Sequence, residues 1–124
     1  MKYIRVYDQT DSKLVIDKLF NSWERKKPKL LISVTGGAQK FSLKQRLRDV
    51  FRRGLIKAAQ STGAWISTGG FNVGVMKHVG EAMRGNLSSF SQKNEIVVLG
   101  IATWEMVLHN EKLINRHNVS LFKS

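Results

Sequence analysis

The fold is decided by the stretch Leu30-Leu31-Ile32-Ser33-Val34-Thr35-Gly36-Gly37, a nearly continuous apolar run that ends in a threonine and a double glycine. Such a run is typical of a parallel strand covered on both faces. The same pattern returns in Ala64-Trp65-Ile66-Ser67-Thr68-Gly69-Gly70, and a helix-like segment follows each turn. Because the carboxyl ends of parallel strands meet at one edge of a sheet, we expect the two glycine turns to lie side by side.

Outward from this stretch, strand patterns and helix patterns alternate along the chain. The predicted strands are residues 3–7, 29–34, 64–67 and 95–102. The predicted helices run from caps at residues 10–12 to about residue 25, from residue 43 (with Ser42 as its cap) to 61, and from 73 to 84, with Gly63 as a stop signal. Residues 85–94 predict a flexible connection, and the tail from residue 105 has only weak helical character.

This alternation predicts an α/β fold: a Rossmann-like, doubly wound, mainly parallel sheet of about four strands with flanking helices. With 124 residues and 42% apolar content, we expect one domain with one core. Its parts are the first strand and helix in residues 1–27, a glycine-turn core in residues 28–104 and a tail in residues 105–124.

Composition excludes several classes of function. Cysteine is absent, so disulfides, thiolate metal sites and cysteine nucleophiles are excluded, and a reducing, cytosolic setting fits best. The N-terminus has no signal-peptide pattern, and the longest apolar stretch, near residues 96–102, is far shorter than the roughly 20 residues that span a bilayer. We therefore expect a soluble segment that does not itself insert into a membrane.

The chain is strongly basic, with a net charge of +12. Much of this charge falls on the helix predicted at 43–61, in two rows that flank an apolar stripe; the rows are Lys44, Arg48 and Arg52, and Arg46, Arg53 and Lys57. The stripe consists of Leu43, Leu47, Val50, Phe51, Gly54, Leu55 and Ala58. The rows are either a solvated helix face, with the side-chain stems over the edge of the core, or a polyanion site.

The two glycine turns are the strongest chemical signal. Glycine lets the backbone approach an anion closely, and the following helix presents unpaired N–H groups with a partial positive charge. The segment 69–74 lacks the glycine spacing of the dinucleotide fingerprint, and neither turn ends in the Gly-Lys-Ser/Thr of a Walker loop. The sequence predicts a phosphate or nucleotide cradle of a less common kind, with tight turns alone as the alternative.

Other polar residues give weaker signals. Asn72 suits either a helix cap or a ligand donor, and Trp104 either packs or stacks on a base. Glu81 has no visible nucleophile or second carboxylate beside it, so we predict a solvated carboxylate and no catalytic residue. The histidines lack metal-ligand spacing, which predicts ordinary surface or helix-face positions and no metal site; they are His78, His109 and His117.

Longer motifs carry a resemblance to a known family. They are residues 30–38, 51–66, 68–70, Gly74-Val75-Met76-Lys77-His78-Val79-Gly80-Glu81-Ala82 and Gly100-Ile101-Ala102-Thr103-Trp104. Over about residues 28–115 the chain resembles the cytosolic N-terminal homology region of melastatin-type transient receptor potential (TRPM) cation channels. That region is a SLOG-type, Rossmann-like nucleotide-sensor domain, and the resemblance implies that this chain corresponds to the N-terminal part of a larger domain.

The resemblance implies a nucleotide-sensing regulatory segment of a calcium-permeable, homotetrameric channel, in the cytosol beside the plasma membrane. The implied partners are the remaining channel polypeptide and neighbouring subunits, not nucleic acid; no cofactor is required, and the implied ligand is ADP-ribose or a related nucleotide. The implied binding residues are Thr35, Gly36, Gly37, Gln39, Thr68, Gly69, Gly70, Asn72 and Gly74.

Two alternatives stay open. Phosphoribohydrolases of the same superfamily are similar at the glycine turn 69–74, but their second glycine motif and its glutamate are missing here, which argues against hydrolysis. A basic module that binds nucleic acid or another polyanion would use the helix at 43–61.

Overall fold

The computed structural model describes residues 3–23, 26–86, 95–114 and 120–121. Contacts divide the chain into two units, residues 28–102 and residues 1–27 with 103–124.

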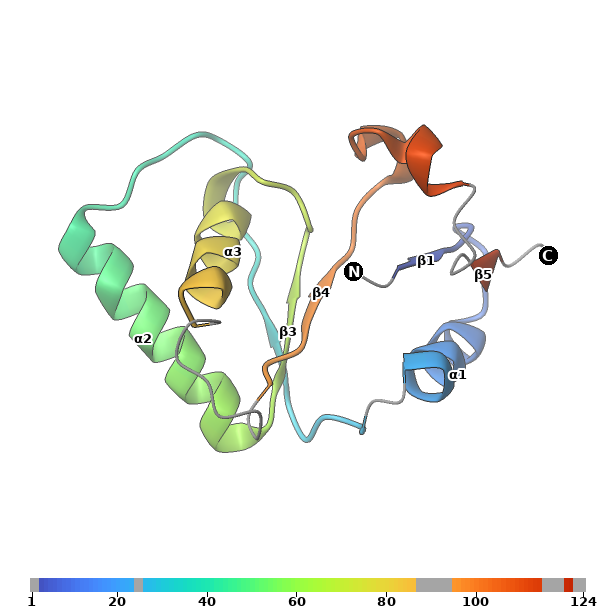
Figure 1. Ribbon diagram of the computed structural model, residues 1–124, viewed down its shortest axis with the longest axis horizontal. Coiled ribbons are helices and arrows are strands. Elements are labelled where there is room, and N and C mark those ends of the chain that lie inside the picture. Colours follow the sequence, from blue (N-terminus) through green and yellow to red (C-terminus); the bar gives the residue numbers. More distant parts are fainter. Residues whose placement is uncertain (1–2, 24–25, 87–94, 115–119, 122–124) are drawn as a thin grey trace. The chain divides into compact units, whose positions relative to one another are not determined.

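The unit formed by residues 28–102 is a three-stranded parallel sheet with two helices (Figure 1). Its strands, in the spatial order β2-β3-β4, are β2 (Leu31–Ser33), β3 (Trp65–Thr68) and β4 (Val98–Gly100). Its helices are α2 (Gln45–Thr62) and α3 (Gly74–Asn86). Ile32 pairs with Ile66, which pairs with Val98 on the other side. The predicted α/β class with a parallel sheet is confirmed.

Both helices pack on the same face of this sheet. Ala59 of α2, Ile66 of β3 and Val79 of α3 form the buried core, and Ile66 is fully buried. The strands are added in one direction, so two right-handed crossovers place both helices on one side.

Local sequence explains the ends of α2. Gly63 has a left-handed φ of 64°, and its N–H donates to the Ala59 carbonyl, as predicted for a glycine stop. The start differs from the prediction: the N-cap is Lys44, without a side-chain capping hydrogen bond, and Ser42 lies outside the helix. The end of α3 at Asn86 runs two residues into the predicted connection, whose residues 87–94 lie outside the described part.

The other unit holds the remaining elements. They are β1 (Ile4–Arg5), α1 (Ser12–Trp23), the 3₁₀ turns η1 (Trp104–Met106) and η2 (Asn110–Leu113), and β5 (Ser120–Leu121). Asp11 caps α1, because its carboxylate accepts the Lys13 N–H at 2.9 Å.

The first strand does not join the glycine-turn sheet. β1 pairs in parallel with β5, with Ile4 opposite Ser120, so the expected four-stranded sheet is three strands plus a separate pair. In the same unit the Tyr3 hydroxyl donates to the Leu113 carbonyl. The Arg5 guanidinium lies 4.4 Å from the Trp104 ring centroid. Trp104 therefore has an intramolecular cation–π partner in Arg5.

Candidate functional site

Both glycine turns lie at the carboxyl edge of the β2-β3-β4 sheet. Backbone pairing continues up to the turns: the Val34 N–H donates to the Ser67 carbonyl at 2.8 Å, and the Ile101 N–H donates to the Thr68 carbonyl at 2.9 Å. Because all three strands are parallel, residues 35–37, 69–70 and 100–101 emerge from the same rim (Figure 1).

The first turn packs against the start of α3. Gly74 has a left-handed φ of 55°, and a Cβ there would overlap the Gly37 carbonyl oxygen. A Cβ at Gly36 would lie 3.0 Å from Val75 Cγ1. The two turns are thus direct neighbours through the N-terminus of α3, as the sequence pattern predicts.

The second turn packs against the end of β4. A Cβ at Gly70, whose φ is 72°, would lie 3.1 Å from the Gly100 Cα. Backbone contact and left-handed φ values therefore account for glycine at positions 70 and 74 without any ligand. Gly36 and Gly37 remain exposed and open to an approaching molecule.

The two threonines have different environments. Thr68 is buried, and its hydroxyl oxygen accepts the Gly70 N–H at 3.0 Å, so this side chain shapes the turn. Thr35 is exposed at the same rim, as is Gln39 further along. Of the two hydroxyls, that of Thr35 is the one on the open surface.

Asn72 stands exposed just before α3. Within the described ranges its side chain makes no hydrogen bond, so the capping role weighed for it is not seen there. The first hydrogen bond of α3 runs from the Lys77 N–H to the Val73 carbonyl at 3.3 Å. The N–H groups of residues 74–76 precede that bond and have no partner within the helix, which gives this rim a partial positive charge.

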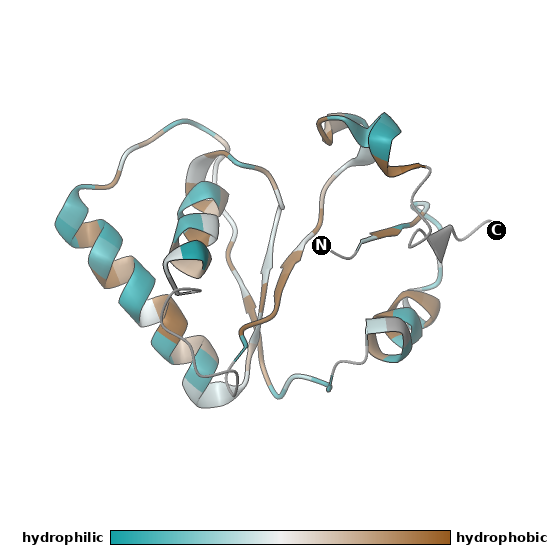
Figure 2. Ribbon diagram, viewed as in Figure 1, coloured by the Kyte–Doolittle hydropathy of each residue, from teal (hydrophilic) through white to brown (hydrophobic). Residues whose placement is uncertain are grey.

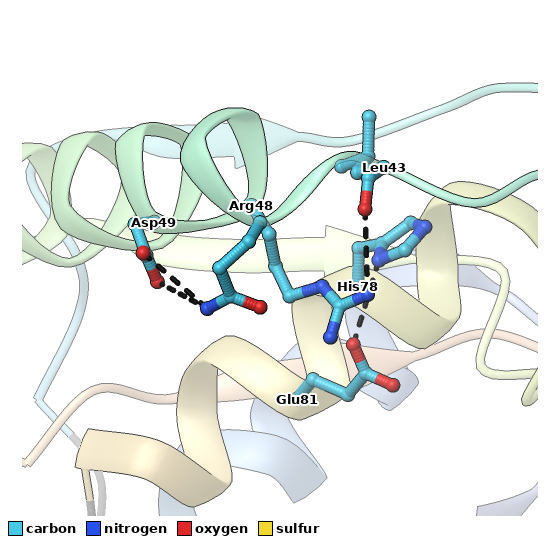
Figure 3. Close-up of polar contacts among 6 residues, drawn as sticks. Leu43, Arg48, Asp49, His78 and Glu81 are labelled. Carbon is cyan, nitrogen blue, oxygen red and sulfur yellow. Dashed lines mark hydrogen bonds and ion pairs between the residues drawn. The ribbon is translucent and has the colours of Figure 1, made fainter.

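The structure reveals a buried histidine that sequence reasoning misplaced. His78 is 5% exposed, one turn into α3, and Phe41 from the loop before α2 lies 5.0 Å from it, ring centroid to ring centroid. Neither ring nitrogen has a hydrogen-bond partner in the described part of the chain, although Glu81 Oε2 lies 3.5 Å from Nδ1 (Figure 3). The spacing from Gly74 to His78, one helical turn on the packed face, is the signal that could have indicated burial.

His109 and Glu81 are both more exposed than His78. His109 is 72% exposed, as predicted for a surface histidine, and His117 lies outside the described residues. Glu81 is 32% exposed and faces His78 rather than bulk solvent alone. Across the residues that the structure describes, no group of three metal-binding side chains gathers.

A cavity of about 170 Å³ lies at the opposite rim, where α2 ends and β3 begins. It is lined by Ala59, Gln60, Gly63, Ala64, Trp65, Glu95 and Ile96. Pockets for nucleotide-sized ligands occupy about 300–1,000 Å³, so this cavity is too small for one. None of its lining residues is among the binding residues predicted from the sequence.

Comparisons with known proteins agree with this fold. A family model described as "SLOG in TRPM" matches residues 1–124. The chain is 53% identical over 116 residues to transient receptor potential cation channel subfamily M member-like 2 of Nematostella vectensis. It is 50% identical over 115 residues to subfamily M member 2 of Mus musculus and 42% identical over 123 residues to subfamily M member 7 of Homo sapiens.

The matches cover almost all of this chain but little of each relative. They span 94%, 92% and 99% of the chain, and 8%, 8% and 6% of the respective relatives. Among the described helices, none combines the length and hydropathy needed to cross a bilayer. The relatives are named as cation channels, and the chain corresponds to a channel segment rather than to an enzyme. With a family match over its full length and relatives at these identities, the chain belongs to the SLOG family of TRPM channels.

Proposed function

We propose that this regulatory segment senses ADP-ribose or a related sugar diphosphate at the rim formed by residues 35–39 and 68–74. The proposal includes a cytosolic position in a calcium-permeable, tetrameric channel. The observation that carries it is the contact between the first glycine turn and the N-terminus of α3, since a Cβ at Gly74 would overlap the Gly37 carbonyl oxygen. An exposed first turn, a partly exposed second turn and one helix terminus thereby converge on a single area.

The chemistry of this rim suits a phosphate group. The free N–H groups at the start of α3 donate hydrogen bonds and carry a partial positive charge that favours an anion. Lys40 follows the first turn and Lys77 lies in the first turn of α3; both are exposed. The Thr35 hydroxyl and the Asn72 amide add neutral donors for phosphate or ribose oxygens.

Regulation would follow from linkage. A ligand that binds the rim more tightly in the open channel than in the closed one shifts the gate by that difference in affinity and by no more. A site on an exposed rim can supply such a difference if neighbouring segments close over it in only one state.

The test is isothermal titration calorimetry of the 124-residue chain with ADP-ribose. The blocking variant is Gly37→Val, because a Cβ at Gly37 meets only the Gln39 backbone nitrogen, at 4.0 Å, and the fold can accept it. The matched control is Gly80→Ala, since nothing lies within 4 Å of a Cβ there. We expect heat of binding in the parent chain and the control, and a loss of about tenfold or more in affinity in Gly37→Val.

Three results would reject the proposal. The first is no heat from a folded parent chain, and the second is equal affinity in Gly37→Val. The third is binding of any polyanion with an affinity that falls steeply with salt and is unchanged in Gly37→Val. That result would favour the basic-module alternative. Chromatography of the incubated ADP-ribose checks the hydrolase alternative, for which released ribose phosphate would be the sign.

A further inference from the structure

The outer side of α2 carries apolar residues that this chain does not bury. The sequence predicts one apolar stripe on the helix, but only its inner part packs: Phe51 and Leu55 contact the core around Ala59. The outer residues, which we call the outer stripe, are Leu47, Val50, Gly54 and Ala58; all are exposed, Leu47 at 56% and Val50 at 53%. Figure 2 shows the resulting mixture of hydrophobic and hydrophilic residues along α2.

Gly54 is the least expected member of the outer stripe. It lies in the interior of an 18-residue helix, where glycine lowers stability relative to alanine. Nothing lies within 4 Å of the position that its Cβ would take, so no contact in the described structure requires glycine. Its lack of a side chain leaves a gap in the outer stripe between Val50 and Ala58, where another helix can approach the backbone more closely than at a larger residue.

A row of uncompensated positive charge runs along one side of the outer stripe. This basic row consists of Arg46, Arg53 and Lys57, which are exposed. Within the described ranges, none of the three forms an ion pair with a carboxylate. Asp49 is the single acidic residue of α2, and its carboxylate accepts hydrogen bonds from Gln45 at 3.2 and 3.3 Å. Arg53 Nε donates to the Asp49 backbone carbonyl at 3.4 Å, and the Arg53 side chain is exposed.

We infer that the outer stripe and the basic row together dock an amphipathic α-helix of another protein segment, one that carries small apolar residues flanked by Asp or Glu. Charge complementarity selects acidic flanks, and the gap at Gly54 selects a helix rather than a flat surface. A second copy of this chain fits poorly, because each copy carries a net charge of +12. A membrane fits poorly too, because faces that enter a bilayer surface present Trp, Phe or Leu, whereas two of the four residues of this stripe, Gly54 and Ala58, have little or no side chain.

The experiment uses the 124-residue chain and a synthetic helical peptide with an Ala and Leu stripe flanked by Glu. A second peptide replaces every Glu by Lys. Fluorescence anisotropy measures both affinities, and circular dichroism confirms that each protein variant is folded. We expect the Glu peptide to bind, with affinity that falls as salt rises, and the Lys peptide not to bind.

Two pairs of variants locate the surface. Gly54→Gln fills the gap and should weaken binding of the Glu peptide about tenfold or more, whereas its control Gly80→Gln, on the outer face of α3 with equal space around its Cβ, should not. The double change Arg53→Glu with Lys57→Glu should abolish binding. Its control, Lys77→Glu with Arg84→Glu, alters net charge equally on exposed positions of α3 and should retain most of the affinity.

Several results would overturn the inference. They are no binding of the Glu peptide, equal loss in Gly54→Gln and Gly80→Gln, or binding that depends on net charge alone. Tighter binding to duplex DNA or to phosphatidylserine vesicles than to the Glu peptide would assign the basic row to another partner. A dimer in sedimentation equilibrium that Gly54→Gln dissociates would assign the outer stripe to self-association.

Discussion

At the scale of single residues, His78 is the strongest departure from ordinary packing. A buried imidazole has at least one N–H and one further nitrogen that prefer hydrogen bonds, and both nitrogens of His78 lack such a bond in the described part of the chain. The Glu81 carboxylate oxygen at 3.5 Å from Nδ1 is an ion-pair contact when the imidazole is protonated. Leaving a buried polar group without a hydrogen bond costs about 1–3 kcal/mol.

His78→Leu should therefore raise the free energy of unfolding, by about 1 kcal/mol. Leucine keeps the apolar contact with the Phe41 ring and removes the unpaired nitrogens. Urea denaturation monitored by circular dichroism measures the change, with Glu81→Gln as the control for the carboxylate. A clear loss of stability in His78→Leu would show that the imidazole has a stabilising partner in solution.

At the scale of elements, α2 contains two glycines with opposite roles. Gly63 ends the helix in a left-handed conformation that other residues adopt only at a cost, while Gly54 sits in regular helix with open space around it. The same glycine-to-alanine substitution should therefore change the free energy of unfolding in opposite directions at these two positions of α2.

Gly63→Ala should lower the free energy of unfolding by about 1–2 kcal/mol, because alanine is strained at a φ of 64°. Gly54→Ala should raise it by about 0.5–1 kcal/mol through higher helix propensity. Thermal and urea denaturation of both variants give the comparison. If both changes moved stability in the same direction, the described boundary of α2 would be wrong.

How far the elements follow from sequence depends on how local their causes are. The Gly63 stop, the Asp11 cap and the β3 strand with its double glycine were predictable, because their causes lie within a few residues. The pairing of β1 with β5 was not predictable, because a strand of two residues is too short to have a sequence pattern that indicates which strand it pairs with.

Burial was harder to predict than element type. A three-to-four spacing of apolar residues shows that a face is apolar, but not whether this chain covers it, which is why Val50 was placed with Leu55. At the candidate site, the adjacency of the turns followed from parallel strands. The use of the Thr68 hydroxyl inside its own turn did not, because its hydrogen bond to the Gly70 N–H depends on local backbone geometry.

At the scale of the whole molecule, the two units rest on different interactions. Residues 28–102 have a small apolar core in which Ile66 and Val79 are the largest fully buried side chains. In the other unit, the described contacts include the β1–β5 pairing, the Tyr3 hydrogen bond to Leu113 and the Arg5–Trp104 contact. Changes in the two sets should then add rather than couple.

Tyr3→Phe should cost about 1 kcal/mol and Ile66→Val about 0.5–1.5 kcal/mol, and the double variant should equal their sum within about 0.5 kcal/mol. Hydrogen exchange localises each effect. Tyr3→Phe should speed exchange near Ile4 while leaving Ile66 unchanged. If the stability loss of the double variant differed from the sum by more than that margin, or if Tyr3→Phe sped exchange in β3, the two units would be shown to unfold together.

The parallel pairing of Ile4 with Ser120 has a consequence for synthesis on the ribosome. Residues 28–102 hold all three strands of their sheet and can fold as soon as they leave the exit tunnel. β1 is translated before this sheet and β5 after it, so β1 must wait for β5, and closing so long a loop carries a large entropic cost. β1 should thus reach its native place later than the sheet that is translated after it, and during that interval it is available to chaperones.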